Sequence, residues 1–210
     1  ATIAKKVDVL SADQIRTFVN ANPTAAYDVG KTFVSLLGKA NTDWQDEIFQ
    51  NAFATDNNLS IAGKFHGVPY RVSAGYLDQQ GLLITDRFNR ATGAITISPR
   101  LFTDHLKIDL SLKGTLTESH FANDNNNAIA NAIQFDPTQS VTASNQFGNY
   151  FEWLRADGTL NPNAPRNPVA QVMLRDNNGN AARSFGNLRF DYSFHFLPEL
   201  HANLNLGYDI

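Results

Sequence analysis

The sequence predicts an all-β protein built on one antiparallel sheet of about six strands, with long loops and a short helix near the N-terminus. Two observations support this fold class. Apolar and polar residues alternate with a period of two through several segments, as in strands with two different faces. Asparagine, which favours turns, and phenylalanine and tyrosine, which favour pleated surfaces, are also frequent.

The composition excludes several classes of protein. The 210 residues carry a net charge of −3, which argues against the basic surface of a nucleic-acid-binding protein. The chain has no cysteine, so a disulfide framework, a cysteine-ligated zinc and a thiol nucleophile are excluded. Its apolar runs are too short for a membrane-spanning helix. We expect no signal peptide, because no charged segment followed by an apolar core opens the chain.

Two short helices are predicted before the first strand, over residues 11–20 and 42–53. Ser11 is a suitable N-cap for the first helix, and Gln14 completes a capping box three residues later. The second helix is weaker, with Asn41 or Thr42 as its N-cap and Trp44 on its apolar side.

Strand patterns begin after these helices. Four of them are strong; in residues 106–116, for example, leucine and isoleucine alternate with lysine, aspartate, serine and threonine. Such alternation indicates an antiparallel sheet with one apolar and one wet face. The six strands are predicted over residues 58–65, 70–76, 91–101, 106–116, 188–196 and 202–210.

The connections between these strands alternate in length. Short links at 66–69, 102–105 and 197–200 alternate with a medium loop after Leu77 and a very long one from about 122 to 183. Transmembrane β-barrels have short turns on one rim and long external loops on the other. The sequence therefore predicts part of the wall of an antiparallel transmembrane β-barrel.

The composition of the two predicted faces agrees with a barrel wall. The polar face mixes charges of both signs with serine, asparagine and glycine, as suits a wet lumen. A soluble carbohydrate-binding β-sandwich is the alternative, because it would also show alternation and loop aromatics. A secreted glycosidase is a third candidate. Aromatic residues near strand ends of the apolar face resemble a membrane girdle: Phe65, Tyr70, Tyr76, Phe196 and Tyr208.

Seven short motifs, in order along the chain, resemble the SusC/RagA family of TonB-dependent outer-membrane transporters. Two of them are NTDWQDEI at residues 41–48 and YRVSAGYLDQQG at 70–81, and it is the series of seven rather than any one motif that is specific. The others are KKVDVLSADQ at 5–14, NLS at 58–60 with Gly63, Arg90 at the start of the next strand, AIQFDPT at 132–138 and NPVA at 167–170.

The resemblance implies a fragment of a barrel of roughly 22 strands closed around a plug. It implies that the plug lies outside this chain. The chain would then divide into an external helix-containing loop (1–57), strands (58–122), a long extracellular loop (123–182) and further strands (183–210).

The resemblance also implies a function. The family imports oligosaccharides or oligopeptides across the bacterial outer membrane, which the barrel crosses many times. Its implied partners are a SusD-like surface lipoprotein that acts as a lid, TonB acting through the plug, and outer-membrane lipid. No enzyme activity, cofactor or nucleic-acid partner is implied.

Residues that suggest catalysis or metal binding have simpler interpretations. Asp43, Asp46 and Glu47 are too close in sequence to flank one glycosidic bond, so packing around Trp44 is favoured. The five histidines lack zinc-site spacing, and three of them are expected in turns: His66, His105 and His201. The run at 123–127 lacks the glycine and glutamate of an EF-hand, so a loop tip is favoured over a calcium site.

Two groups of residues are candidates for binding. Aromatic side chains of the loops, which stack on sugars or anchor interfaces, are assigned to lid contact or loop packing: Trp44, Phe147, Tyr150 and Trp153. Charged residues of the polar face are expected mostly to bond to the plug or to neighbouring strands. Three of them are weak substrate-binding candidates: Arg71, Arg189 and Asp191.

Overall fold

The computed structural model describes residues 1–28, 31–122 and 127–210, so most of the run at 123–127 lies outside the described residues. The chain forms two compact units, which we name the loop unit and the sheet unit. The loop unit is Ala1–Ala52, Gly81–Asp86 and Phe121–Asn177; the sheet unit is Phe53–Gln80, Arg87–His120 and Asn178–Ile210.

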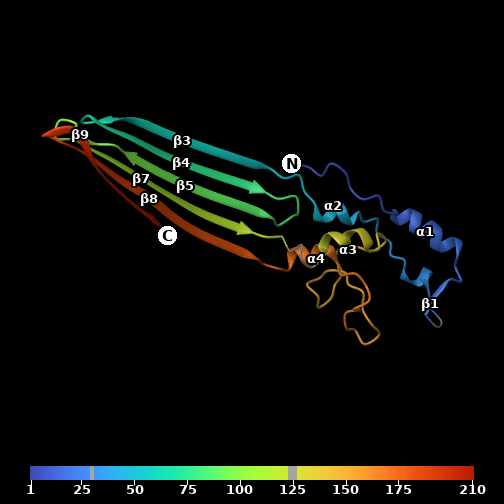
Figure 1. Ribbon diagram of the computed structural model, residues 1–210. Helices are drawn as coiled ribbons and strands as arrows, with labels where there is room; N and C mark the ends of the chain where they lie inside the picture. Colours follow the sequence, from blue (N-terminus) through green and yellow to red (C-terminus); the bar gives the residue numbers. More distant parts are fainter. Residues whose placement is uncertain (29–30, 123–126) are drawn as a thin grey trace. The chain divides into compact units, whose positions relative to one another are not determined.

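The sheet unit is one antiparallel sheet in which every long strand pairs with its neighbour in sequence (Figure 1). The predicted sheet of six long strands is confirmed. A short strand, β6 (Arg100–Leu101), also pairs with β7. The six strands are β3 (Ala54–Phe65), β4 (Val68–Gln80), β5 (Arg87–Ile97), β7 (Leu106–His120), β8 (Asn178–Phe194) and β9 (Leu197–Asp209).

The register of these strands separates the two faces as the alternation predicts. Leu110 of β7 lies between Ile97 of β5 and Leu188 of β8. One residue earlier, Asp109 lies opposite Arg189. Because successive side chains point to opposite sides of a sheet, the apolar and charged sets occupy opposite faces.

Short turns join the strands at one end of the sheet. His66 and Gly67 alone connect β3 to β4, and both have positive φ angles, 49° and 84°, as a tight hairpin turn requires. The β8–β9 turn is at residues 195–196, not at 197–200 as predicted. A register shift after Ser193 carries the chain into β9 earlier, and the Ser193 hydroxyl donates to the Pro198 carbonyl (2.8 Å).

The strands continue beyond the predicted limits at the other end. In these extensions, the side of the sheet that is apolar elsewhere carries polar residues. The alternation therefore ends while the backbone pairing of the strands continues. The polar residues are Thr55, Asp78, Asn89, Glu118 and Asn180. The strand predicted at 91–101 is instead interrupted, because β5 ends at Ile97 and Pro99, which has no N–H to donate, precedes β6.

The loop unit contains the predicted first helix, α1 (Ala12–Ala21). Its capping box is present: the Gln14 N–H donates to Ser11 Oγ (3.2 Å), and the Ser11 N–H donates to Gln14 Oε1 (2.8 Å). A two-stranded hairpin of β1 (Ala26–Asp28) and β2 (Lys31–Thr32) follows, and then a 3₁₀ turn, η1 (Phe33–Leu36).

The second helix, α2 (Trp44–Ile48), is shorter than predicted, and its N-cap is Asp43 rather than Asn41 or Thr42. Asp43 Oδ1 accepts the N–H groups of Gln45 (3.0 Å) and Asp46 (3.2 Å), whereas the Thr42 hydroxyl donates to the Gln139 carbonyl (2.6 Å). The helix ends where Phe49 forms a bridge with Leu83.

The long connection between β7 and β8 also differs from the predicted loop. It runs over Phe121–Asn177 and contains two helices, α3 (Ala128–Gln134) and α4 (Pro168–Met173). Within the described residues no helix is long and apolar enough to cross a membrane. The helices α2, α3 and α4 enclose the core of the loop unit: Trp44, Ile48, Ala128, Ala132, Phe135, Val169 and Val172.

Candidate functional site

Trp44 lies at the centre of the loop unit with only 2% of its surface exposed. Its Nε1 donates to the carbonyl of Asp136 (2.9 Å), and its ring contacts the ring of Phe135 edge-on, with centroids 4.5 Å apart. An indole buried with its N–H satisfied contributes packing and orientation together. Trp44 therefore joins α2 to the segment that follows α3.

The N-terminal segment is held against α2 by polar contacts. The Gln45 side chain donates to the Val7 carbonyl (2.8 Å) and accepts the Val7 N–H (2.9 Å), as a strand partner would. Lys6 forms ion pairs with Asp43 (3.0 Å) and Asp46. Burial raises the pKa of Asp43, but hydrogen bonds from Lys6 and from backbone N–H groups outweigh it, so the pKa lies below its ordinary value.

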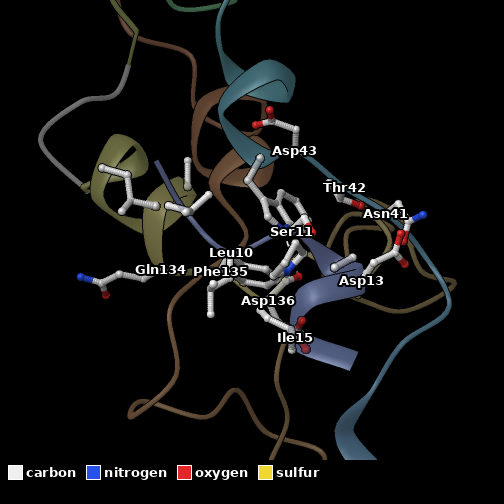
Figure 2. A pocket seen from close by; sticks show the side chains of 16 residues that line it. Leu10, Ser11, Asp13, Ile15, Asn41, Thr42, Asp43, Gln134, Phe135 and Asp136 are labelled. Carbon is white, nitrogen blue, oxygen red and sulfur yellow. Dashed lines mark hydrogen bonds between the residues drawn. The ribbon is translucent and has the colours of Figure 1, made fainter. Parts of the chain in front are cut away.

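A groove of about 650 Å³ lies between the start of α1, residues 41–44 and residues 132–137 (Figure 2). Its lining is largely apolar but includes three carboxylates. Asp13 pairs with Arg16 (3.0 Å), Asp43 pairs with Lys6, and Asp136 accepts the Thr138 N–H (2.8 Å). Because each carboxylate stabilises the local fold, none is positioned as half of an acid–base pair.

Asn167 is the residue before α4, and its side chain is completely buried. Its Oδ1 caps α4 by accepting the N–H groups of Val169 (3.0 Å) and Ala170 (3.1 Å). Its Nδ2 donates to the carbonyls of Val141 (2.9 Å) and Phe151 (3.0 Å). This role is not predicted from the sequence, although an asparagine followed by proline is a known helix start.

Glu152 is the buried carboxylate of this region, with 8% of its side chain exposed. Its Oε1 accepts the Asn167 N–H (3.2 Å), while its Oε2 has no hydrogen-bond partner among the described residues and lies 3.8 Å from an Arg166 nitrogen. Burial raises the pKa of Glu152, and the Asn167 N–H and the Arg166 charge oppose that shift only in part.

The four aromatic candidates of the loops occupy different environments. Trp44 is in the core, and Tyr150 and Trp153 pack against it. Trp153 also contacts Phe151, with ring centroids 5.1 Å apart. Phe147 lines a separate surface hollow beside Arg155. The structure thus places three of them within the loop unit's own packing.

The three charged candidates lie on the polar face of the sheet but do not form one site. Arg189 lies 3.9 Å from Asp191, which also contacts His201 at 2.6 Å. Arg71 is on β4, separated from β8 by two intervening strands. Arg189 and Asp191 therefore form one charged cluster, and Arg71 belongs to another part of the face.

His66 and His105 lie in turns as predicted, but His201 does not. His201 lies within β9, and the β8–β9 turn contains His195, whose ring stacks on that of His105 with centroids 3.8 Å apart. Parallel stacked rings cannot direct two in-plane nitrogen lone pairs at one metal ion. Among the described residues no group of three or more His, Asp or Glu side chains could hold a metal.

Comparison with known proteins identifies the chain, although no family model matches it. The TonB-dependent receptor SusC of Bacteroides thetaiotaomicron is 38% identical over 97% of this chain. This chain is a SusC homologue. The TonB-dependent receptor P3 of Formosa agariphila is 29% identical over 51% of the chain. The chain spans about a fifth (21%) of SusC and a tenth (10%) of P3.

This homology confirms the family resemblance of the motifs. TonB-dependent receptors are proteins of the bacterial outer membrane, so the SusC homologue is part of an outer-membrane protein. Both matched proteins are TonB-dependent receptors, and the carboxylates around Trp44 are engaged in local contacts.

Proposed function

We propose that the chain supplies an arc of barrel wall and an external loop to an importer of oligosaccharides or oligopeptides in the outer membrane. The observation that carries this proposal is the two-faced register of the sheet. Several apolar side chains of one face are more than half exposed: Leu59, Ile61, Leu116, Leu204 and Leu206. Lipid, rather than water, is the solvent that suits such a face.

The height of the apolar face supports a membrane crossing. On β7 it extends from Leu106 to Leu116, ten residue steps that span about 34 Å along the strand. With the usual tilt of about 45° this corresponds to roughly 24 Å, close to the apolar band of outer-membrane barrels. Exposed Phe65 and Phe196 adjoin the short turns, and Tyr76 lies in the last apolar row, as in an aromatic girdle.

The alternative, a soluble carbohydrate-binding sandwich, requires a second sheet over the apolar face. Among the described residues, the apolar face of the sheet unit remains exposed, and the other sheet has only two short strands. The barrel wall is therefore favoured.

The loop unit would lie outside the cell, joined to the sheet at the end opposite the short turns. We propose that a SusD-like lipoprotein covers it. Phe147 and the groove at the start of α1 are available for that contact, because Trp44, Tyr150 and Trp153 serve internal packing. Energy would come from TonB through a plug domain supplied by the rest of the receptor.

Site-directed spin labelling of the full-length receptor in bilayers tests the barrel wall. Leu116→Cys and Thr117→Cys are adjacent on β7 but on opposite faces. A label at position 116 should be relaxed by oxygen dissolved in lipid, and one at 117 by a water-soluble nickel complex. Equal access of the water-soluble reagent to both positions would contradict the proposal.

A further inference from the structure

Two glycines in the middle of the sheet are not required by their surroundings. Gly93 of β5 and Gly114 of β7 pair with each other, in a register that continues on both sides without a bulge. Neither has a positive φ angle, and a Cβ atom added to either would meet no described atom within 4 Å beyond its chain neighbours. A glycine weakens a strand, and one that serves neither a bulge nor close packing leaves room for a ligand at the backbone.

The two glycines lie in a hollow of the apolar face. The hollow has a volume of about 570 Å³, and Leu116 and Ile210 border it. Small side chains of the same face surround the glycines: Ala91, Ala182 and Ser184. The strands β5 and β7 have their partners β4 and β8 in place, so no strand from elsewhere in the receptor can insert beside them.

A second hollow, of about 330 Å³, lies on the same face of the same three strands. On each strand, the next outward residue of the face belongs to this second hollow. The neighbouring pairs are Ala91 and Asn89 on β5, Leu116 and Glu118 on β7, and Ala182 and Asn180 on β8. The two hollows therefore lie end to end, one apolar and one polar.

The lining of the second hollow suits hydroxyl groups better than a phosphate. Arg87 is already bonded to Asp78 by two hydrogen bonds (3.1 and 2.8 Å), whereas Glu118 makes no ion pair or hydrogen bond within the described residues. A phosphate would meet an unpaired carboxylate and a neutralised guanidinium. Sugar hydroxyl groups can donate to Glu118 and pair with amides. The other lining residues are Asn89, Ser119, His120, Asn178 and Asn180.

We propose that the two hollows bind a glycolipid of the surrounding membrane, with an acyl chain over the two glycines and an uncharged sugar headgroup in the polar hollow. The six residue steps from Gly114 to His120 give the site a length of about 20 Å along the strand. The inference rests on the proposed barrel wall, which presents its apolar face to lipid, and adds a lipid-binding site to it.

Native mass spectrometry of the purified full-length receptor, released from lipid nanodiscs, tests the proposal. The discs contain monogalactosyl diacylglycerol, phosphatidylglycerol and phosphatidylcholine in equal amounts and with the same acyl chains, so that only the headgroups differ. Methyl galactoside added in solution distinguishes a lipid headgroup from a free sugar. The measured quantity is the number of molecules of each lipid retained by the receptor.

Gly114→Leu is the variant for the apolar hollow, because its side chain would occupy the open space. Ala202→Leu is the matched control, since Ala202 is exposed on the same face, opposite Tyr192 and outside the hollow. Gly114→Ala shows whether the wall needs a glycine in order to bend. Heat-modifiable migration on gels shows whether each variant has formed a barrel, and Gly93→Leu serves if Gly114→Leu has not.

The variant for the polar hollow combines Glu118→Ala with Asn180→Ala. Its control combines Thr55→Ala with Asn57→Ala, which removes polar groups from the same face of β3 and leaves the hollow unchanged.

We expect the unaltered receptor to retain about threefold more galactolipid than phosphatidylglycerol, as for one added hydrogen bond of modest net strength. Methyl galactoside should leave this ratio unchanged. Gly114→Leu should retain about threefold less of the galactolipid, as for the loss of one buried CH₂ group. The polar-hollow variant should retain the two lipids equally, and Gly114→Ala and both controls should behave as the unaltered receptor does.

Several results would overturn the inference. Retention in proportion to the disc composition, or unchanged retention in Gly114→Leu, would show that the hollows are ordinary lipid-facing surface. A preference for phosphatidylglycerol would assign the polar hollow to an anionic headgroup, and competition by methyl galactoside would assign it to a free sugar. Failure of Gly114→Ala to form a barrel would show that the glycine bends the wall.

The proposed barrel wall is tested separately by the spin labels at positions 116 and 117. If those labels place the apolar face in lipid, the wall stands whatever lipid is retained. If they do not, the wall and the glycolipid site are both wrong.

Discussion

At the scale of single residues, the Asn167 side chain connects the start of α4 to the backbone of Val141 and Phe151. All four of its hydrogen-bonding positions are used in a fully buried site. Asn167→Ala removes a helix cap and a donor from the carbonyls of Val141, which keeps the Phe151 N–H, and Phe151, so we expect the loop unit to lose about 2–4 kcal/mol of stability. This loss of stability should appear as faster hydrogen exchange of the α4 amides in the full-length receptor.

Asn163→Ala is the control, because Asn163 is exposed and its side chain makes no hydrogen bond in the described structure. Exchange rates in α4 should stay unchanged in this variant. If both substitutions had the same small effect, Asn167 would not be the organising residue.

Glu152 gives a pH-dependent prediction at the same scale. Its pKa is raised in the folded protein by burial. At a pH below the pKa of Glu152 in the unfolded chain, the carboxyl is protonated in both states and burial does not destabilise the fold. The folded state loses stability as the pH rises through the raised pKa of Glu152 in the folded protein. Glu152→Gln keeps an acceptor for the Asn167 N–H without the charge, so α4 exchange should be slower in the variant at pH 8 and equal to the native rate at pH 4. If α4 exchange in Glu152→Gln were slower than in the native protein at pH 4 but not at pH 8, the predicted direction of the pH dependence would be wrong.

At the scale of elements, the closest backbone approach in the loop unit depends on Gly38. A Cβ atom there would lie 2.0 Å from the Thr138 carbonyl oxygen. In this region residues 38–42 lie alongside residues 137–139 and are hydrogen-bonded to them. Gly38→Ala must therefore separate the two segments, and we expect a cost of about 1–3 kcal/mol, seen as faster exchange at Ala40 and Thr42. Gly93→Ala, which places a Cβ in open space, should cost far less.

The elements differ in how far the sequence predicts them. The six long strands and α1 follow from local signals: alternation in the strands, and the Ser11–Gln14 capping box in the helix. The polar ends of the strands are not predicted, because they pair through backbone hydrogen bonds and show no alternation of apolar and polar residues. The helices α3 and α4 escape it too, since six or seven residues carry little periodic signal and are stabilised mainly by contact with Trp44 and α2.

The candidate site is harder to predict than the fold. The motif around Trp44 marks a place of structural importance, but the partners of Trp44 lie more than 90 residues away, and only folding shows which carboxylates are engaged. The separation of Arg71 from Arg189 and Asp191 is also absent from the sequence as a motif, because it depends on the order of the strands in the sheet.

At the scale of the whole molecule, the direction of each side chain determines what solvent it meets. Leu110 and Ser111 are adjacent on β7 but face opposite ways. In the full-length receptor, Leu110→Arg should cost about 2–4 kcal/mol near the bilayer midplane, whereas Ser111→Arg should change stability little. Urea unfolding of the receptor in vesicles measures both, and equal effects would contradict the assignment of the faces.

The abrupt end of the apolar face gives the molecule a fixed depth in the bilayer. Between the row of Tyr76 and Leu116 and the next row, with Asp78 and Glu118, the outer surface changes from apolar to charged in about 7 Å. Sinking by one row would bring two carboxylates into hydrocarbon. Where membrane thickness varies, the lipid around this wall should therefore stretch or thin to match the protein, while the protein keeps its height.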